Sequence, residues 1–192
     1  MKESIFIAII IVLIYIFLFI NRSSLRLIET HNRKVLVRNS PNYLDHAILL
    51  SQLINNMYKL RDYMIANKSS FPEFIQYINL LEGNFNEKRT RIYENSPYSN
   101  YTSYSVNKGE EFVFFLKCKK EDKLHTLNLL TYVAVHEMAH AGCPEIGHTP
   151  LFNKIFKFFL QQAQHIGIYI YENYRANPVY YCGMKLYSNI LN

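Results

Sequence analysis

The sequence of 192 residues predicts an α+β fold, with an apolar helix at the N-terminus followed by one globular domain. Three observations lead to this prediction. Residues 5–20 form an uncharged apolar run, a stretch rich in Tyr, Thr, Val and Phe occupies residues 84–120, and apolar residues recur at helical spacing on both sides of that stretch. These patterns favour a small antiparallel sheet packed on the helix that follows it.

The apolar run IFIAIIIVLIYIFLFI predicts a transmembrane helix. At about 1.5 Å per residue the run covers roughly 24 Å, so snorkelling by Lys2 and Arg22 has to help it span a bilayer. A cleaved signal peptide is the alternative, but the following residues, NRSSLR, hold no clear small-x-small cleavage site. We therefore expect a transmembrane anchor at residues 1–22, a juxtamembrane linker at residues 23–33 and a single domain at residues 34–192.

The basic residues around this run predict its orientation. The N-terminal side carries Lys2, whereas the C-terminal side carries Arg22, Arg26, Arg33, Lys34 and Arg38. The positive-inside rule then places the C-terminal domain of a single-pass membrane protein in the cytosol, or in a virion interior. The three cysteines form no CxxC pair, which agrees with a reducing compartment.

Local patterns predict the elements that precede the HExxH motif, which is described in the next paragraph. Residues 34–38, KVLVR, predict a short strand, and two helices are expected at about residues 41–67 and 71–83. Asn107-Lys108-Gly109 predicts a hairpin turn. The segments TSYSV and EEFVFFLKC should therefore pair as antiparallel strands immediately before the motif.

A helix beginning near Thr126, TLNLLTYVAVHEMAHA, contains an HExxH motif. Its histidines, His136 and His140, stand at positions i and i+4, so their imidazoles share one face about 6 Å apart. At that spacing both can bind one Zn²⁺ at roughly 2.0–2.1 Å per nitrogen. Glu137 falls beside the metal, where a carboxylate can take a proton from a water molecule and pass it to a leaving amine.

A third protein ligand is expected beyond this helix. His148 precedes a new helix start at Thr149, and a turn there could bring its imidazole back to the metal. Glu172 is the main alternative, following zinc enzymes that use a downstream glutamate. Cys143 and Glu145 lie in the turn itself. The cysteine is the weaker candidate because a thiolate reduces the Lewis acidity of the metal.

The C-terminal part of the chain predicts packing more than chemistry. The helix after Thr149 has a broad apolar face and stops at Gly167, and a turn and strand are expected around NPVYYCGMKLYSN. A hydroxyl of Tyr180 or Tyr181 could stabilise an oxyanion, although a packed aromatic ring is the simpler interpretation. No role is predicted for the other histidines, His31, His46, His125 and His165.

Residues 102–160, about a third of the chain, resemble the WLM and SprT-like zinc metallopeptidases, especially the small versions of giant DNA viruses and algae. The resemblance lies in a strand shortly before the HExxH helix, a loop, a further histidine and an aromatic-containing helix. It implies a zincin-like domain in which His136 and His140 bind Zn²⁺ and Glu137 is the base. His148 corresponds to the third ligand, but its interval is longer than usual for the family.

The resemblance also implies that the strand at residues 112–116 lies along the cleft and pairs with an extended substrate. The expected function is thus a membrane-anchored zinc metalloendopeptidase acting on a protein or peptide substrate. The alternative is a catalytically inactive membrane or virion structural protein that retains a zincin fold. The net charge of +6 is scattered, so no specific nucleic-acid partner is expected.

Overall fold

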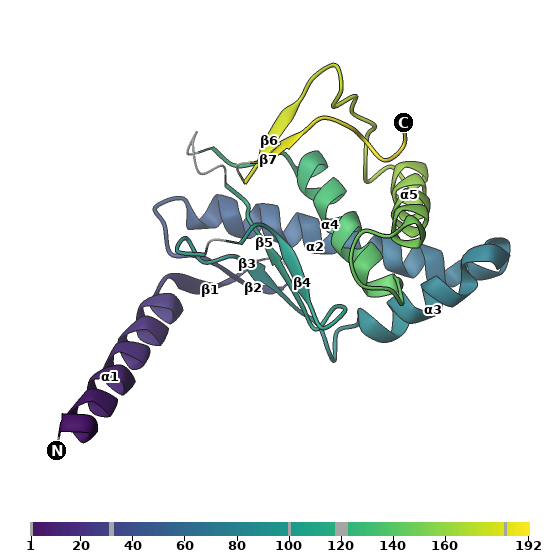
Figure 1. The fold of residues 1–192 in the computed structure, drawn as a ribbon. Helices are drawn as coiled ribbons and strands as arrows, with labels where there is room; N and C mark the ends of the chain where they lie inside the picture. The colour runs from purple at the N-terminus through teal and green to yellow at the C-terminus, as the bar shows by residue number, and fades with distance from the viewer. Residues whose placement is uncertain (1, 31–32, 100, 118–122, 183) are drawn as a thin grey trace.

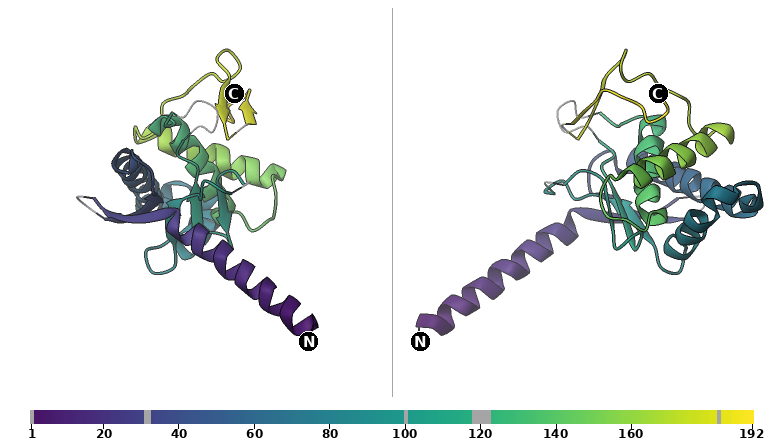
Figure 2. Two further views of the ribbon diagram at one scale, coloured as in Figure 1. Left: turned by 90° about the vertical axis from the view of Figure 1, so that its left-hand side faces the viewer. Right: turned by 45° about the vertical axis from the view of Figure 1, so that its right-hand side comes forward.

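The computed structural model describes residues 2–30, 33–99, 101–117, 123–182 and 184–192, with the backbone alone for residues 2–4 and 20–23. A five-stranded sheet lies against helices α2 and α4, and α1 extends away from this body (Figures 1 and 2). The predicted α+β class is confirmed. The helices are α1 (Lys2–Ser23), α2 (Tyr43–Ala66), α3 (Ile75–Asn84), α4 (Leu127–Gly142) and α5 (Pro150–His165), with short 3-10 turns at Lys68–Ser70 and Pro72–Phe74. The strands are β1 (Leu25–Glu29), β2 (Lys34–Arg38), β3 (Arg91–Glu94), β4 (Tyr104–Val106), β5 (Glu111–Phe114), β6 (Val179–Tyr181) and β7 (Met184–Leu186).

The main sheet is mixed, and the prediction of a small antiparallel sheet is wrong in this respect. Its strand order is β1-β2-β3-β5-β4, in which β2 pairs with β3 and β3 with β5 in parallel. The chain reaches β3 from β2 through α2 and α3, and such a helical crossover brings two strands together in parallel. The predicted hairpin between β4 and β5 is present, with Tyr104 opposite Val113.

Strand β1 occupies part of the segment predicted as a juxtamembrane linker, residues 23–33. It pairs antiparallel with β2 over its whole length, from Leu25 opposite Arg38 to Glu29 opposite Lys34. Backbone hydrogen bonds therefore join this segment to the sheet, so it is an edge strand of the domain and not a linker.

Helix α1 corrects the prediction about the membrane. Its apolar side chains from Ile5 to Phe19 are solvent-exposed. At about 1.5 Å per residue they cover roughly 22 Å, less than the ~30 Å of a hydrocarbon core. Among the residues that the structure describes, none of the helices combines the length and apolar character needed to cross a membrane. The prediction of a single-pass membrane protein, with its deduced orientation, is therefore wrong.

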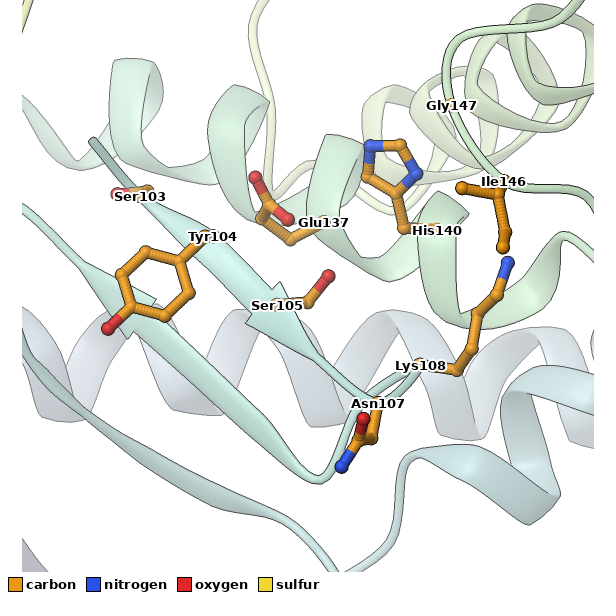
Figure 3. Close-up of a pocket in the computed structure, with 9 residues that line it drawn as sticks. All are labelled: Ser103, Tyr104, Ser105, Asn107, Lys108, Glu137, His140, Ile146 and Gly147. Atoms are coloured by element: carbon orange, nitrogen blue, oxygen red, sulfur yellow. The ribbon is translucent and has the colours of Figure 1, made fainter. Parts of the chain in front are cut away.

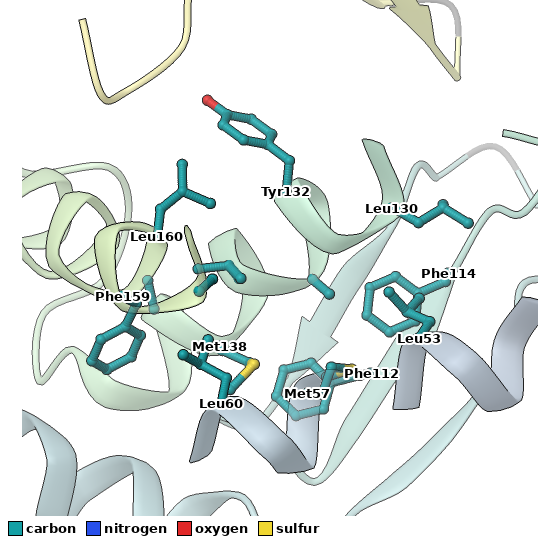
Figure 4. Close-up of a cluster of buried hydrophobic side chains, with 14 of the residues drawn as sticks. Leu53, Met57, Leu60, Phe112, Phe114, Leu130, Tyr132, Met138, Phe159 and Leu160 are labelled. Atoms are coloured by element: carbon teal, nitrogen blue, oxygen red, sulfur yellow. The ribbon is translucent and has the colours of Figure 1, made fainter. Parts of the chain in front are cut away.

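The hydrophobic core lies between the sheet, α2 and α4 (Figure 4). Leu53, Met57 and Leu60 of α2 are spaced three and four residues apart, so they fall on one face of the helix, and none is more than 2% exposed. They pack with Phe112 of β5, while Met138 of α4 lies in the same cluster. This core fixes α4 against the sheet.

A buried carboxylate ties three elements together at the base of the sheet. Glu94 at the end of β3 is 0% exposed, and its carboxylate accepts a hydrogen bond from the Arg38 backbone N–H at 2.7 Å. The Arg38 Nε atom lies 3.3 Å from the same carboxylate, and His46 Nδ1 of α2 lies 2.8 Å away. Because a buried charge requires such partners, the cluster holds β2, β3 and α2 in fixed positions. His46 thus has a structural role as a partner of Glu94, which its spacing in the sequence did not indicate.

Gly142, the last residue of α4, has no room for a side chain. A Cβ atom there would lie 2.9 Å from Phe159 Cζ of α5 and 3.2 Å from the Tyr77 backbone oxygen. We expect Gly142→Ala to lower the free energy of unfolding by about 1–3 kcal/mol, measured by urea denaturation, because the α4–α5 contact is overpacked. Gly83→Ala is the matched control, since nothing lies within 4 Å of its Cβ position in α3. It should be neutral or stabilise by up to about 1 kcal/mol, and equal destabilisation by the two variants would contradict this packing.

Candidate metal centre and cleft

Helix α4 presents the HExxH motif on its last two turns. Its first turn is capped by the Thr126 hydroxyl, which accepts a hydrogen bond from the Leu129 N–H at 3.2 Å. The helix ends at Gly142, because Pro144 disfavours helical backbone angles at Cys143, which is extended with φ −95° and ψ 130°. The rings of His136 and His140 lie on one face with their centroids 4.9 Å apart.

The loop between α4 and α5 returns His148 to these two histidines. Gly147 has a φ of +84°, a left-handed conformation that lets the loop turn back. The Thr149 hydroxyl then caps α5 by accepting from the Phe152 N–H at 3.2 Å. As a result, the Nε2 atom of His148 lies 3.0 Å from that of His136.

The three imidazoles fit a metal ion. One nitrogen of each of His136, His140 and His148 can be chosen such that all lie within 4.8 Å of one another. A tetrahedral Zn²⁺ with bonds of 2.0–2.1 Å requires nitrogen–nitrogen distances of about 3.3 Å, so a small side-chain adjustment brings these atoms to that spacing. A set of three imidazoles also leaves a fourth position open, as catalytic zinc sites do.

Phenylalanine rings of α5 form one wall of the histidine cluster. The ring of His140 stacks on Phe152 with centroids 4.2 Å apart, and the rings of His136 and Phe156 meet edge to face at 5.1 Å. Burial, followed by the charges of His140 and His148, lowers the pKa of His136 to about 3. Burial, followed by His148 and Lys108, lowers the pKa of His140 to about 4. The neutral imidazole is the form that binds a metal.

Glu137 points from α4 toward β4 (Figure 3). Its side chain is 6% exposed, and this burial raises the pKa of Glu137 to about 7 against the opposing hydrogen bonds from the hydroxyl and backbone of Ser105. Ser105 is a site residue that the sequence analysis missed. Its place on a half-buried strand carries no local signal for this contact.

A cleft of about 510 Å³ runs between β4 and the HExxH helix. Figure 3 shows the residues that line it: Ser103, Tyr104, Ser105, Asn107, Lys108, Glu137, His140, Ile146 and Gly147. The strand along the cleft is thus β4, at the edge of the sheet, and not the strand at residues 112–116. The latter includes β5, which is paired on both sides, with β3 and β4. That expectation is wrong because a strand paired on both sides has no free edge to offer to a substrate backbone.

The other candidate ligands lie apart from the three histidines or are engaged elsewhere. Glu172 accepts a hydrogen bond from Asn128 Nδ2 at 2.6 Å. Asn128 lies in the first turn of α4, roughly 12 Å along the helix axis from His136. The carboxylate of Glu145 accepts a hydrogen bond from the Thr149 hydroxyl. Cys143 is a buried free thiol. Among the described residues, the group suited to a metal ion contains none of these three.

The two tyrosines considered for oxyanion stabilisation lie outside the cleft. Tyr181 is 2% exposed; its hydroxyl contacts the Ser103 hydroxyl and donates to the Phe115 backbone oxygen at 3.2 Å. Tyr180 is exposed and lines a second, smaller pocket beside Glu172. Tyr181 is accordingly a packed aromatic that joins the C-terminal hairpin to the sheet.

Comparison with known proteins identifies viral relatives, while no protein-family model matches the chain. The sequence is 37% identical over 160 residues to the uncharacterized protein R325 of Acanthamoeba polyphaga mimivirus, covering 83% of this chain and 80% of that protein. The chain belongs to the family of that mimivirus protein. A segment of 68 residues, 35% of this chain, is also 38% identical to the uncharacterized protein 136R of Invertebrate iridescent virus 6, of which it covers 38%.

The fold of this mimivirus-type protein is similar to that of Wss1 from Saccharomyces cerevisiae. Two crystal structures of Wss1, one of them of a mutant, superpose with a TM-score of 0.50 and cover 68% of this chain and 85–86% of theirs. The sequences are 16–17% identical, so the likeness concerns the fold alone. The likeness supports a WLM-like fold, which agrees in part with the resemblance of the HExxH segment.

The histidine cluster makes a direct prediction about zinc content. We expect about one Zn²⁺ per purified full-length chain, lost in His136→Ala and sharply reduced in His148→Ala, measured by elemental analysis. Glu172→Ala should retain zinc because its carboxylate lies at the other end of α4. Retention in His148→Ala together with loss in Glu172→Ala would assign the third ligand to Glu172 instead.

Proposed function

We propose that this protein is a zinc-dependent metallopeptidase in which His136, His140 and His148 hold the metal and Glu137 is the general base. The observation that carries the proposal is the convergence of three imidazoles, within 4.8 Å of one another, beside a cleft lined by His140 and Glu137. The similarity of fold to Wss1 supports the same assignment.

A Zn²⁺ ion held by His136, His140 and His148 would supply Lewis acidity to polarise the scissile carbonyl and acidify a water molecule. Glu137 lies beside the ligand histidines and faces the cleft, so it can accept a proton from that water and deliver it to the leaving amine. The Ser105 hydroxyl and backbone hold the carboxylate in this direction. The chain's own contribution is thus an oriented base and a site walled by Phe152 and Phe156.

The substrate of this proposed reaction is a protein or peptide in extended conformation. Strand β4 forms one long side of the cleft and pairs with β5 alone, so its other edge can pair with a peptide backbone. Such pairing recognises the main chain, and side chains are then selected by the cleft walls, including Tyr104 and the 89% exposed Ile146. Nothing among the described residues favours the alternative of an inactive structural protein.

Replacement of the base should separate metal binding from turnover. Glu137→Gln is expected to retain Zn²⁺ and to hydrolyse casein about 10²–10⁴ times more slowly, because the amide cannot accept the proton of the water. Zinc content and product release from casein are the two measurements. Glu82→Gln, at an exposed glutamate of α3, is the matched control and should keep full activity. Unimpaired hydrolysis by Glu137→Gln would rule out this mechanism.

Ser105 should affect the rate through the orientation of Glu137. A hydrogen bond to a charged group contributes about 1.5–3 kcal/mol, so we expect Ser105→Ala to lower kcat about tenfold or more, with KM and zinc content unchanged. The kinetics can be measured with a fluorogenic peptide based on a bond cut in casein. Ser105→Thr keeps the hydroxyl and should recover most of the rate. Equal losses in the Ala and Thr variants would show that the hydroxyl has no part in orienting the base.

A further inference from the structure

We propose that Lys108 is a positioning residue for the metal site, holding the loop of residues 143–148 so that His148 reaches the other two histidines. The inference rests on the proposed function, since it concerns the third ligand of the same site. It is carried by the contacts of one lysine side chain that crosses from the sheet to the loop.

Lys108 stands at the tip of the β4–β5 hairpin and reaches the loop with its ammonium group. Its Nζ atom donates to the Cys143 backbone oxygen at 2.8 Å and to the Glu145 backbone oxygen. Figure 3 shows the side chain pointing from the turn toward Ile146. Two carbonyls of the loop are therefore fixed by one donor on a different part of the chain, three to five residues before His148.

The hairpin turn that carries Lys108 is itself firmly held. Asn107, Lys108 and Gly109 have φ values of +46°, +58° and +112°, and the Asn107 backbone oxygen accepts a hydrogen bond from Arg89 Nη2 at 2.9 Å. A Cβ atom at Gly109 would lie 2.9 Å from the Asn84 backbone oxygen, so the turn packs closely on the end of α3. Asn84 in turn donates from Nδ2 to the Ala141 backbone oxygen at 2.9 Å. Lys108 thus extends from an anchored point beside the last turn of α4.

The loop has few restraints of its own. No hydrogen bond joins backbone groups to one another within residues 144–148, all of which are described. Ile146 is 89% exposed, and the contact from the Thr149 hydroxyl to the Glu145 carboxylate is made at an exposed position. Among the hydrogen bonds of the described residues, the two from Lys108 are therefore those that join the backbone of this loop to another part of the domain.

The two possible roles of Lys108, a repelling charge and a positioning group, predict opposite changes in zinc affinity when the lysine is removed. The lysine is close enough to His140 to act on it electrostatically, so by charge alone it opposes a dication at the site. If charge dominated, its removal would strengthen zinc binding. If the lysine positions the loop, its removal weakens zinc binding, because His148 is released from its place.

The experiment compares Lys108→Met, Lys108→Arg and Lys34→Met in the full-length chain, with zinc affinity measured by competition with a chromophoric chelator. Lys108→Met should lose at least about tenfold in affinity, the usual effect of removing a group that orients a ligand. Lys108→Arg keeps a donor that can reach two carbonyls and should stay within about threefold of wild type. Lys34→Met removes the same charge on β2, three strands away from β4, and should bind as wild type does.

A second measurement tests the loop without metal. Cleavage after Glu145 by a glutamyl endopeptidase should be faster in metal-free Lys108→Met than in metal-free wild type or Lys34→Met. Unchanged or tighter zinc binding by Lys108→Met, or weaker binding without faster cleavage, overturns the inference while leaving the proposed function in place. Absence of zinc binding by the wild type itself would overturn both.

Discussion

The packing of α4 is the constraint on which the site depends. This helix has α2, α3 and α5 packed around it and β4 beside it, and most of its residues are buried. Its rotation about its own axis is therefore fixed. One residue of an α-helix corresponds to a turn of about 100°, so a slip of that size would carry His136 and His140 out of the cleft. Gly142 shows how close this packing is, because even a methyl group at its Cα would collide with Phe159.

The surroundings of the histidines determine their chemical state. Rings of α5 cover one side of the cluster, and the low pKa values of His136 and His140 follow mainly from the resulting loss of water. Burying imidazole rings away from water costs stability, so the surrounding core has to offset that cost. The apolar wall is useful nevertheless, since charged imidazoles would repel a metal ion. The same helix that packs against Gly142 thus also lowers the pKa values of His136 and His140 by covering their rings.

The sequence was sufficient wherever a feature depends on residues close together in the chain. The spacing of His136 and His140, the caps at Thr126 and Thr149 and the turn at residues 107–109 all belong to this group. The parallel pairing of β2 with β3 could not be predicted, because more than fifty residues separate the two strands. Their pairing also depends on the hydrogen bond from the Arg38 N–H to the Glu94 carboxylate, which no local pattern indicates. The prediction of a transmembrane anchor at residues 5–20 was wrong because it depended on hydropathy alone. Ser105 and Lys108 act on groups about thirty or more residues away, and no local pattern marks such contacts.

The β4–β5 hairpin connects the two halves of the proposed chemistry. In the proposed mechanism, Ser105 on its edge strand holds the Glu137 carboxylate, and Lys108 at its turn holds the loop that carries His148. Strand β4 is also the edge along which an extended peptide would lie, so one short strand sets the positions of substrate, base and ligand relative to one another. β4 has three residues and a single neighbouring strand in its sheet, which cannot provide much rigidity alone. The bonds of Arg89 and Asn84 near the turn supply the missing restraint, and for this reason the region before β3, distant in sequence from the motif, belongs to the functional architecture.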